Sequence, residues 1–140
     1  MATLDVQLVT PERVVWTGPA TMVSARGVEG DVGILPRHAP LLIALASSVL
    51  RIKGEGEDVR AVVDGGFFHV STSGEVTRVD VLASQAELES EVDQEAAARS
   101  KEEWQRRLDE LAPEAPEAEA EAAKLELAKA EARLSLADRP

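Results

Sequence analysis

The sequence predicts an α+β fold, in which an N-terminal antiparallel β-domain over residues 1–84 is followed by a C-terminal two-helix hairpin over residues 85–140. Two observations support this division. All nine glycines lie before residue 75, whereas the second region has fourteen alanines and no glycine. The first region alternates short apolar stretches with turn residues, and the second is dominated by Ala, Glu, Leu, Lys and Arg, which favour helices.

Seven short apolar stretches in the first region are predicted to be β-strands. In the first and the last of them apolar and polar residues alternate, so that one face of the strand turns inward and the other meets water. Pro, Gly, Asp and Ser residues typical of turns separate the stretches. They are Leu4–Leu8, Val14–Trp16, Thr21–Val23, Ser48–Ile52, Val59–Val63, Phe67–Val70 and Val76–Val81. Many short strands at this spacing favour a small antiparallel sandwich or barrel.

The second region is predicted to form helices over about residues 87–111 and 117–137. Pro113 and Pro116 make residues 112–116 a linker, because proline cannot continue a helix interior. The second helix has apolar residues on two opposite sides. One side holds Ala118, Ala122, Leu125, Ala132 and Leu136, and the other holds Ala120, Ala123, Leu127, Ala130 and Leu134. Such a helix lies between two partners or changes partner. We expect its leucines to be buried in at least one state, whereas helix propensity alone explains the alanines equally well.

The net charge of −11 is unevenly distributed, with −3 in residues 1–84 and −8 in residues 85–140. It disfavours nucleic acid and anionic lipid as partners, because phosphate binding depends on clustered Lys and Arg. The absence of cysteine excludes disulfides and Cys-based zinc sites. The uncharged run His38–Leu50 is shorter than the ~20 residues of a spanning helix, and the N-terminus has no signal-peptide pattern. We therefore expect a soluble, intracellular protein.

Candidate catalytic and metal-binding residues are few. The two histidines, His38 and His69, lack the spacing of a helix-borne metal site, and a structural role is the simpler interpretation. The sequence contains neither a GxxxxGK[ST] phosphate loop nor a GxSxG elbow. Solvation explains the carboxylates on the predicted helix faces. We expect no enzyme activity, no metal and no cofactor, which leaves a binding, structural or regulatory role.

The segment Gly30–Leu42, GDVGILPRHAPLL, resembles the signature GELGILPGHAPLL of the epsilon subunit of bacterial and chloroplast F-type ATP synthases, whose mitochondrial counterpart is called delta. Gly65–Val70, GGFFHV, is similar to the family's GGFLEV, and Ala128–Leu134 is similar to its last helix. Other segments agree in order, so that the resemblance covers essentially the whole chain. It implies a β-sandwich followed by two helices.

The resemblance also implies a function. The implied function is that of a non-catalytic rotor subunit in the central stalk of a proton-translocating ATP synthase. The implied location is the cytoplasmic side of the cell membrane, as a peripheral membrane protein. The implied partners are the gamma subunit, the polar loops of the c-ring and the alpha/beta catalytic head. The family's c-ring contacts correspond here to Asp31, Arg37 and His38. Because Arg37 replaces a glycine, we expect this position not to require a positive φ.

The helices of the family form an arm that either folds on the sandwich or extends toward the catalytic head, where it obstructs ATP hydrolysis. The basic residues implied for this regulation are Arg99, Arg106, Lys129 and Arg133. Sixteen acidic residues share the same region. We therefore expect inhibition that is weak or that depends on apolar packing.

Some members bind ATP through a motif I/L-D-x-x-R-A at the start of the first helix. In the corresponding Val92–Ala97, Asp93 and Ala97 match, but Ala96 stands at the arginine position. Arg133 matches an arginine of the second helix. The missing cation disfavours an ATP site at Asp93 and Arg133. An ATP-sensing module and a free-standing adaptor that joins unrelated proteins remain as alternative hypotheses.

Overall fold

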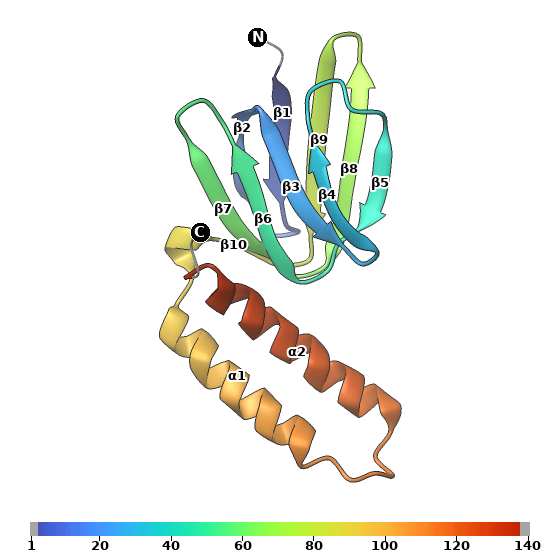
Figure 1. Ribbon diagram of the computed structural model, residues 1–140, viewed down its shortest axis with the longest axis vertical. Coiled ribbons are helices and arrows are strands. Elements are labelled where there is room, and N and C mark those ends of the chain that lie inside the picture. Colours follow the sequence, from blue (N-terminus) through green and yellow to red (C-terminus); the bar gives the residue numbers. More distant parts are fainter. Residues whose placement is uncertain (1–2, 138–140) are drawn as a thin grey trace. The chain divides into compact units, whose positions relative to one another are not determined.

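The computed structural model describes residues 3–137 and contains a β-sandwich and a helical hairpin (Figure 1). The chain divides into two compact units between Glu91 and Val92. This architecture confirms the predicted fold class and selects the sandwich over the barrel.

Two five-stranded sheets form the sandwich, with strand orders β2-β1-β9-β8-β5 and β10-β7-β6-β3-β4. The first sheet contains β1 (Leu4–Val9), β2 (Val14–Ala20), β5 (Leu41–Ala44), β8 (Gly66–Ser73) and β9 (Val76–Ala83). The second contains β3 (Met22–Gly27), β4 (Gly30–Ile34), β6 (Ser48–Lys53), β7 (Asp58–Val63) and β10 (Ala86–Leu88).

One strand pair departs from the antiparallel pattern that the sequence predicted. Strand β1 runs parallel to β9, with Leu4 opposite Thr77 and Val9 opposite Leu82. A parallel pair needs a crossover connection between its strands. Here the strands from β2 to β8 supply that connection, so the first and last long strands of the sandwich lie side by side.

The core lies between the two sheets, where alternate residues of each strand meet. Leu4, Val6 and Leu8 of β1 are fully buried, as the alternation predicted. Phe68 of β8 is the largest fully buried side chain, and Leu50 of β6 is buried in the other sheet. Burial of apolar side chains of this size contributes about 1.5–3 kcal/mol each relative to exposure.

Three short strands, β4, β5 and β10, were not predicted from the sequence. Strands β4 and β5 are edge strands, one in each sheet, and both begin within the Gly30–Leu42 motif. Strand β10 forms because Ala86 and Leu88 pair with Val63 and Ala61 of β7. Its residues favour helix in isolation, but the open edge of β7 offers backbone hydrogen bonds that outweigh this local preference.

The sandwich therefore extends beyond residue 84, where the sequence placed the boundary. After β10, a single 3₁₀ turn, η1 (Glu89–Glu91), belongs to the same compact unit as the sandwich. Arg60 lies 3.3 Å from the Glu89 carboxylate, and Arg13 lies 2.8 Å from that of Glu91.

The hairpin consists of α1 (Gln94–Asp109) and α2 (Glu117–Ser135), which lie antiparallel (Figure 1). Helix α1 begins later than residue 87, because residues 86–91 belong to β10 and η1. The Asp93 side chain caps α1 by accepting the Ala96 N–H at 3.0 Å. The start of α2 agrees with the prediction, directly after Pro116.

The two apolar sides of α2 are buried unequally. On one side Ala123 and Ala130 are buried, and Ala120, Leu127 and Leu134 are partly buried. On the other side Ala132 and Leu136 are buried, whereas Ala118, Ala122 and Leu125 are exposed. Leu125 is 52% exposed. Neither described helix is long and apolar enough to cross a membrane.

Candidate functional site

Asp31, at the start of β4, faces Arg26 across the β3–β4 pair. The Arg26 Nε atom donates to Asp31 Oδ1 at 2.8 Å, and this bond raises the pKa of Arg26. The two side chains are 64% and 72% exposed, so water screens the ion pair. Asp31 remains accessible to a partner, but it already has a cation on its own chain.

Arg37 and His38 lie in a tight turn that follows β4. The His38 N–H donates to the Leu35 carbonyl oxygen at 3.1 Å, and Arg37 has a φ of 70°. Proline at the second position and a positive φ at the third are typical of a type II turn, which favours glycine at the third position. The expectation that residue 37 does not require a positive φ was therefore wrong. Arginine thus occupies the left-handed position of this turn.

The structure does not bring Asp31 together with Arg37 and His38. Asp31 adjoins the Val28–Glu29 turn, where the Val28 N–H donates to Ala44 O at 3.0 Å. Strand β4 extends by about 3.3 Å per residue, and the Arg37 turn follows its other end. The length of the strand therefore separates Asp31 from this turn. All three residues nevertheless lie along the border of the sandwich formed by the edge strands β4 and β5. A partner must extend along this border to contact all of them.

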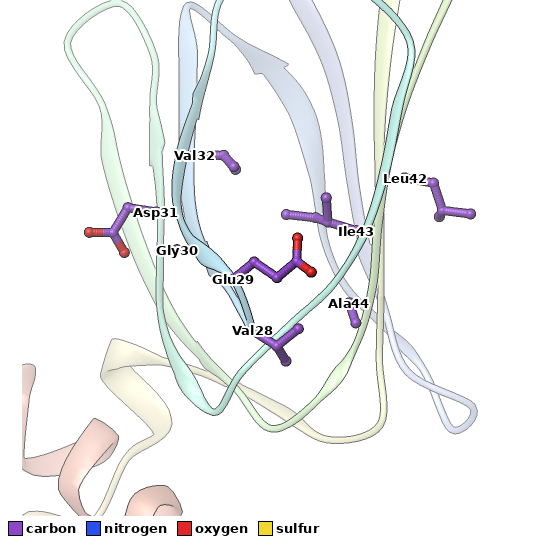
Figure 2. A pocket seen from close by; sticks show the side chains of 9 residues that line it. Val28, Glu29, Gly30, Asp31, Val32, Leu42, Ile43 and Ala44 are labelled. Carbon is purple, nitrogen blue, oxygen red and sulfur yellow. The ribbon is translucent and has the colours of Figure 1, made fainter.

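A pocket of about 400 Å³ opens on the same border (Figure 2). Figure 2 shows Val32 of β4 and Ile43 of β5 pointing into the space between the two strands, and Glu29 reaching toward Ile43. Asp31 and Leu42 point away from this space. The pocket lining is mainly apolar and includes two acidic residues, Glu29 and Asp31, of which Glu29 reaches into the space between the strands. Within residues 3–137, no three His, Asp or Glu side chains are placed to hold a metal ion.

The outer face of the β2-β1-β9-β8-β5 sheet carries a row of apolar side chains, which we call the apolar row. Strand pairing places its members next to one another in the order Val14, Val9, Leu82, Phe67 and Ala44. Val14 is 55%, Leu82 50% and Phe67 53% exposed. The sequence pattern alone did not predict this row. Adjacent Phe67 and Phe68 had to face opposite sides of a strand, but only the register shows which one faces out.

The outer face of the other sheet is polar. Arg51 of β6 pairs with Asp58 of β7 at 2.9 Å, and Arg26 pairs with Asp31. The Arg51 guanidinium lowers the pKa of the Asp58 carboxyl through their hydrogen bond. The two faces of the sandwich therefore differ, and the β2-β1-β9-β8-β5 face is the more apolar one.

Comparison with known proteins identifies the sandwich. Residues 3–89 match the family described as "ATP synthase, Delta/Epsilon chain, beta-sandwich domain". The chain belongs to the ATP synthase delta/epsilon family. The resemblance found in the Gly30–Leu42 motif is thereby confirmed.

Relatives within the delta/epsilon family are similar over most of their length. An ATP synthase epsilon chain of Brevibacillus brevis is 43% identical over 111 residues, which is 79% of this chain and 81% of the relative. One of Mycobacterium sp. (strain KMS) is 47% identical over 104 residues, which is 73% of this chain and 83% of the relative.

Solved structures show the same fold. A chain in the Euglena gracilis mitochondrial ATP synthase, described as "OSCP/F1/c-ring", has a TM-score of 0.80 and 26% identity, over 99% of this chain and 83% of its own length. A chain in the Tetrahymena thermophila mitochondrial ATP synthase, described as "central stalk/cring", has a TM-score of 0.58 and 15% identity, over 93% of this chain and 92% of its own, and shows likeness of fold alone.

The hairpin places the arm residues implied by the delta/epsilon family in two groups. Gln94, next to Asp93, donates from Nε2 to the Arg133 carbonyl oxygen at 2.7 Å, so Asp93 and Arg133 lie at the same end of the hairpin. Lys129 pairs with Glu126 at 3.1 Å, and the Arg133 guanidinium donates to the Lys129 carbonyl oxygen at 2.9 Å.

Arg99 and Arg106 are exposed on α1 and form no ion pair within the described part of the hairpin. Arg106 lines a groove of about 450 Å³ together with Lys101, Glu102 and Leu134. The groove carries both signs of charge. Of the four basic residues singled out in the sequence, Arg99 and Arg106 are thus the ones most available to a partner.

Proposed function

We propose that this chain is the non-catalytic central-stalk subunit of a proton-translocating F-type ATP synthase. In this role it binds the gamma subunit and the c-ring and couples proton flow to ATP synthesis. Membership of the delta/epsilon family and likeness to a chain of an F1/c-ring complex support the assignment. The observation that carries it is the apolar row, because this row is a surface that the isolated sandwich leaves in water.

The gamma subunit is assigned to the β2-β1-β9-β8-β5 face. Phe67 and Leu82 are opposite each other in the β8–β9 pair, and each is about half exposed. Covering the exposed half of each side chain contributes about 1 kcal/mol. Apolar residues gathered in one row, rather than scattered, are typical of a protein interface. The ion pairs of the opposite face make it the poorer candidate.

The c-ring is assigned to the border formed by β4 and β5. Asp31 and the Arg37–His38 turn lie at its two ends, and the pocket beside Glu29 lies between the strands. These side chains carry both signs of charge, which suits the polar loops of a ring better than its apolar surface. Membrane association on the cytoplasmic side then takes place through partner subunits.

We assign to the arm a regulatory contact with the catalytic head through Arg99 and Arg106. Lys129 and Arg133 instead bind groups of the hairpin itself, the Glu126 carboxylate and the Lys129 carbonyl oxygen. Because only two of the four cations are available, inhibition of ATP hydrolysis is expected to be weak. ATP sensing is the less favoured alternative. Asp93 already caps α1, and Ala96 offers no cation for the phosphates.

The apolar row supplies the test. The double variant Phe67→Ser, Leu82→Ser should bind purified gamma subunit at least tenfold more weakly than the natural chain. Val76→Ser is the matched control, because Val76 is 55% exposed on the same sheet but lies outside the row. Both variants should keep the circular dichroism spectrum of the folded chain. Unchanged affinity of the double variant would contradict the proposal for this face.

A further inference from the structure

The turn after β4 carries an arginine in a backbone conformation that disfavours side chains. Arg37 is the one non-glycine residue with a positive φ in the described part of the chain. The left-handed region brings Cβ close to the backbone, so glycine is the usual residue at such a position. Arginine at this position therefore invites a functional explanation.

Two threonines hold this turn against the sandwich. Thr72 and Thr77 face each other in the β8–β9 pair. The Arg37 N–H donates to Thr77 Oγ1 at 2.8 Å, and Thr72 Oγ1 donates to the His38 carbonyl oxygen at 3.3 Å. Thr77 is fully buried. The turn is thus anchored to the core, which fixes the direction in which the Arg37 side chain leaves the backbone.

Arg37 also differs from the other arginines of the sandwich in its ion pairing. Among the described residues of the sandwich, every other arginine pairs with an acid of this chain. These arginines are Arg13, Arg26, Arg51, Arg60 and Arg78. Arg37 is exposed and has no such partner. Leu35, the first residue of the same turn, is 57% exposed, so the turn presents an apolar side chain as well as a charge.

We infer that Arg37 is a preformed cationic contact for a carboxylate on the subunit to which this end of the sandwich docks. The inference rests on the proposed function, which makes the c-ring that subunit. Because the backbone of the turn is already anchored, the loop itself need not be ordered on binding, and the guanidinium can form two parallel hydrogen bonds with a carboxylate. Covering Leu35 would remove water from the pair and strengthen it.

A protein carboxylate is favoured over the phosphate of a lipid headgroup. Residues 1–84 carry a net charge of −3, which opposes binding to an anionic membrane surface. One unpaired arginine is also fewer than the basic cluster that anionic lipid requires. A single complementary acid on a protein loop needs no such cluster.

The test uses the full chain and detergent-solubilised c-ring with bound gamma subunit. Arg37→Gln removes the charge and keeps a side chain at positive φ, whereas Arg37→Gly removes the charge and relieves the backbone. Both should bind three- to tenfold more weakly than the natural chain at low salt, with a smaller dependence on salt. Lys124→Gln, on α2, makes the same change in net charge and should bind like the natural chain.

Thermal unfolding distinguishes a loss of binding from a loss of folding. Arg37→Gly should bind more weakly, yet it should unfold at the same or a higher temperature than the natural chain. Equal affinity and equal salt dependence of Arg37→Gln and the natural chain would overturn the inference alone. Absence of binding by the natural chain would overturn the proposed function and the inference with it. Arg37-dependent binding to phosphatidylglycerol vesicles that lack the ring would assign Arg37 to lipid phosphate. Recovery of Arg37→Glu binding by a ring variant with one loop acid changed to Lys would establish the carboxylate.

Discussion

Arg13 and Glu91, separated by 78 residues in the sequence, are joined by a 2.8 Å ion pair that fastens the last residue of the sandwich to the turn after β1. The same Glu91 oxygen accepts the Leu88 N–H at 2.9 Å. The hydrogen bond from Arg13 lowers the pKa of Glu91, with a further lowering by the Leu88 N–H. The charge of the Glu91 carboxylate thus contributes to the attachment of this end of the sandwich, together with the pairing of β10 with β7.

This pair predicts an acid-sensitive attachment of residues 86–91. Because the pKa of Glu91 is lower in the folded state than in the unfolded chain, its contribution to stability is present above the unfolded pKa and is lost as pH falls through the folded pKa. In Arg13→Gln the pKa of Glu91 should rise toward its ordinary value. NMR titration of the Glu91 carboxyl would measure it, with Arg78→Gln as a control that leaves Glu91 unchanged. An unshifted Glu91 pKa in Arg13→Gln would refute this account.

Gly66 should tolerate no side chain. At a φ of 106°, a Cβ there would overlap the carbonyl oxygen of Leu82 in the neighbouring strand. Gly66→Ala should lower the free energy of unfolding by about 3 kcal/mol or more, because backbone of the sheet must move. Gly56→Ala is the control, since Gly56 shares a positive φ of 76° but meets no atom within 4 Å. It should lose only about 1 kcal/mol. Denaturant titration of both variants measures these free energies of unfolding. Similar losses in Gly66→Ala and Gly56→Ala would contradict the prediction.

Replacing Phe67 and Phe68 by alanine should have different effects on stability and binding. Phe68 is fully buried, so Phe68→Ala should lower the free energy of unfolding by about 3–5 kcal/mol. Phe67 is 53% exposed, so Phe67→Ala should lose less than about 1.5 kcal/mol but bind gamma more weakly. Thermal unfolding and binding to gamma distinguish the two. A larger stability loss in Phe67→Ala than in Phe68→Ala would show the register of β8 to be wrong.

The Asp93 side chain should act as a helix cap rather than as an ATP ligand. Asp93→Ala should destabilise the start of α1 by about 1 kcal/mol, whereas Asp93→Asn should keep the cap, because both side chains accept the Ala96 N–H. Amide hydrogen exchange at residues 94–98 measures the cap. Calorimetry with ATP should give no heat of binding for the natural chain. Millimolar or tighter binding that is lost in Asp93→Asn would instead favour the ATP-sensing hypothesis.

Removal of the arm should change ATP hydrolysis only slightly. The cut belongs after Glu91, because a cut at residue 84 would also remove β10 from its pairing with β7. The complex reconstituted with residues 1–91 should hydrolyse ATP at less than about three times the rate of the complex with the full chain, since two of the four arm cations are already held within the hairpin. A tenfold or greater rise would show strong inhibition by the arm.

The parts of the fold that local signals determine were predictable. Pro116 marks the start of α2 at Glu117, and the alternation in β1 places Leu4, Val6 and Leu8 in the core. The signature Gly30–Leu42 was sufficient to indicate the family. These predictions succeeded because proline geometry, strand periodicity and a specific motif are properties of neighbouring residues.

Other features depended on residues distant in the sequence. Residues 86–88 favour helix, yet they form a strand because β7 has a free edge beside them. Arg37 has a positive φ in a turn that Thr72 and Thr77 of the distant β8–β9 pair bond, whereas the preference of arginine alone predicted otherwise.

The sequence by itself determined that a glycine-rich β-domain precedes an acidic helical arm, and which motif residues to examine. Only the tertiary structure decided that Phe67 faces outward in an apolar row, and that Asp31 and Arg37 lie at opposite ends of one border. The physical reason is that strand register and edge position arise from backbone pairing between distant segments. A shift of one residue in that pairing would exchange the buried and exposed faces, and with them the surface offered to a partner.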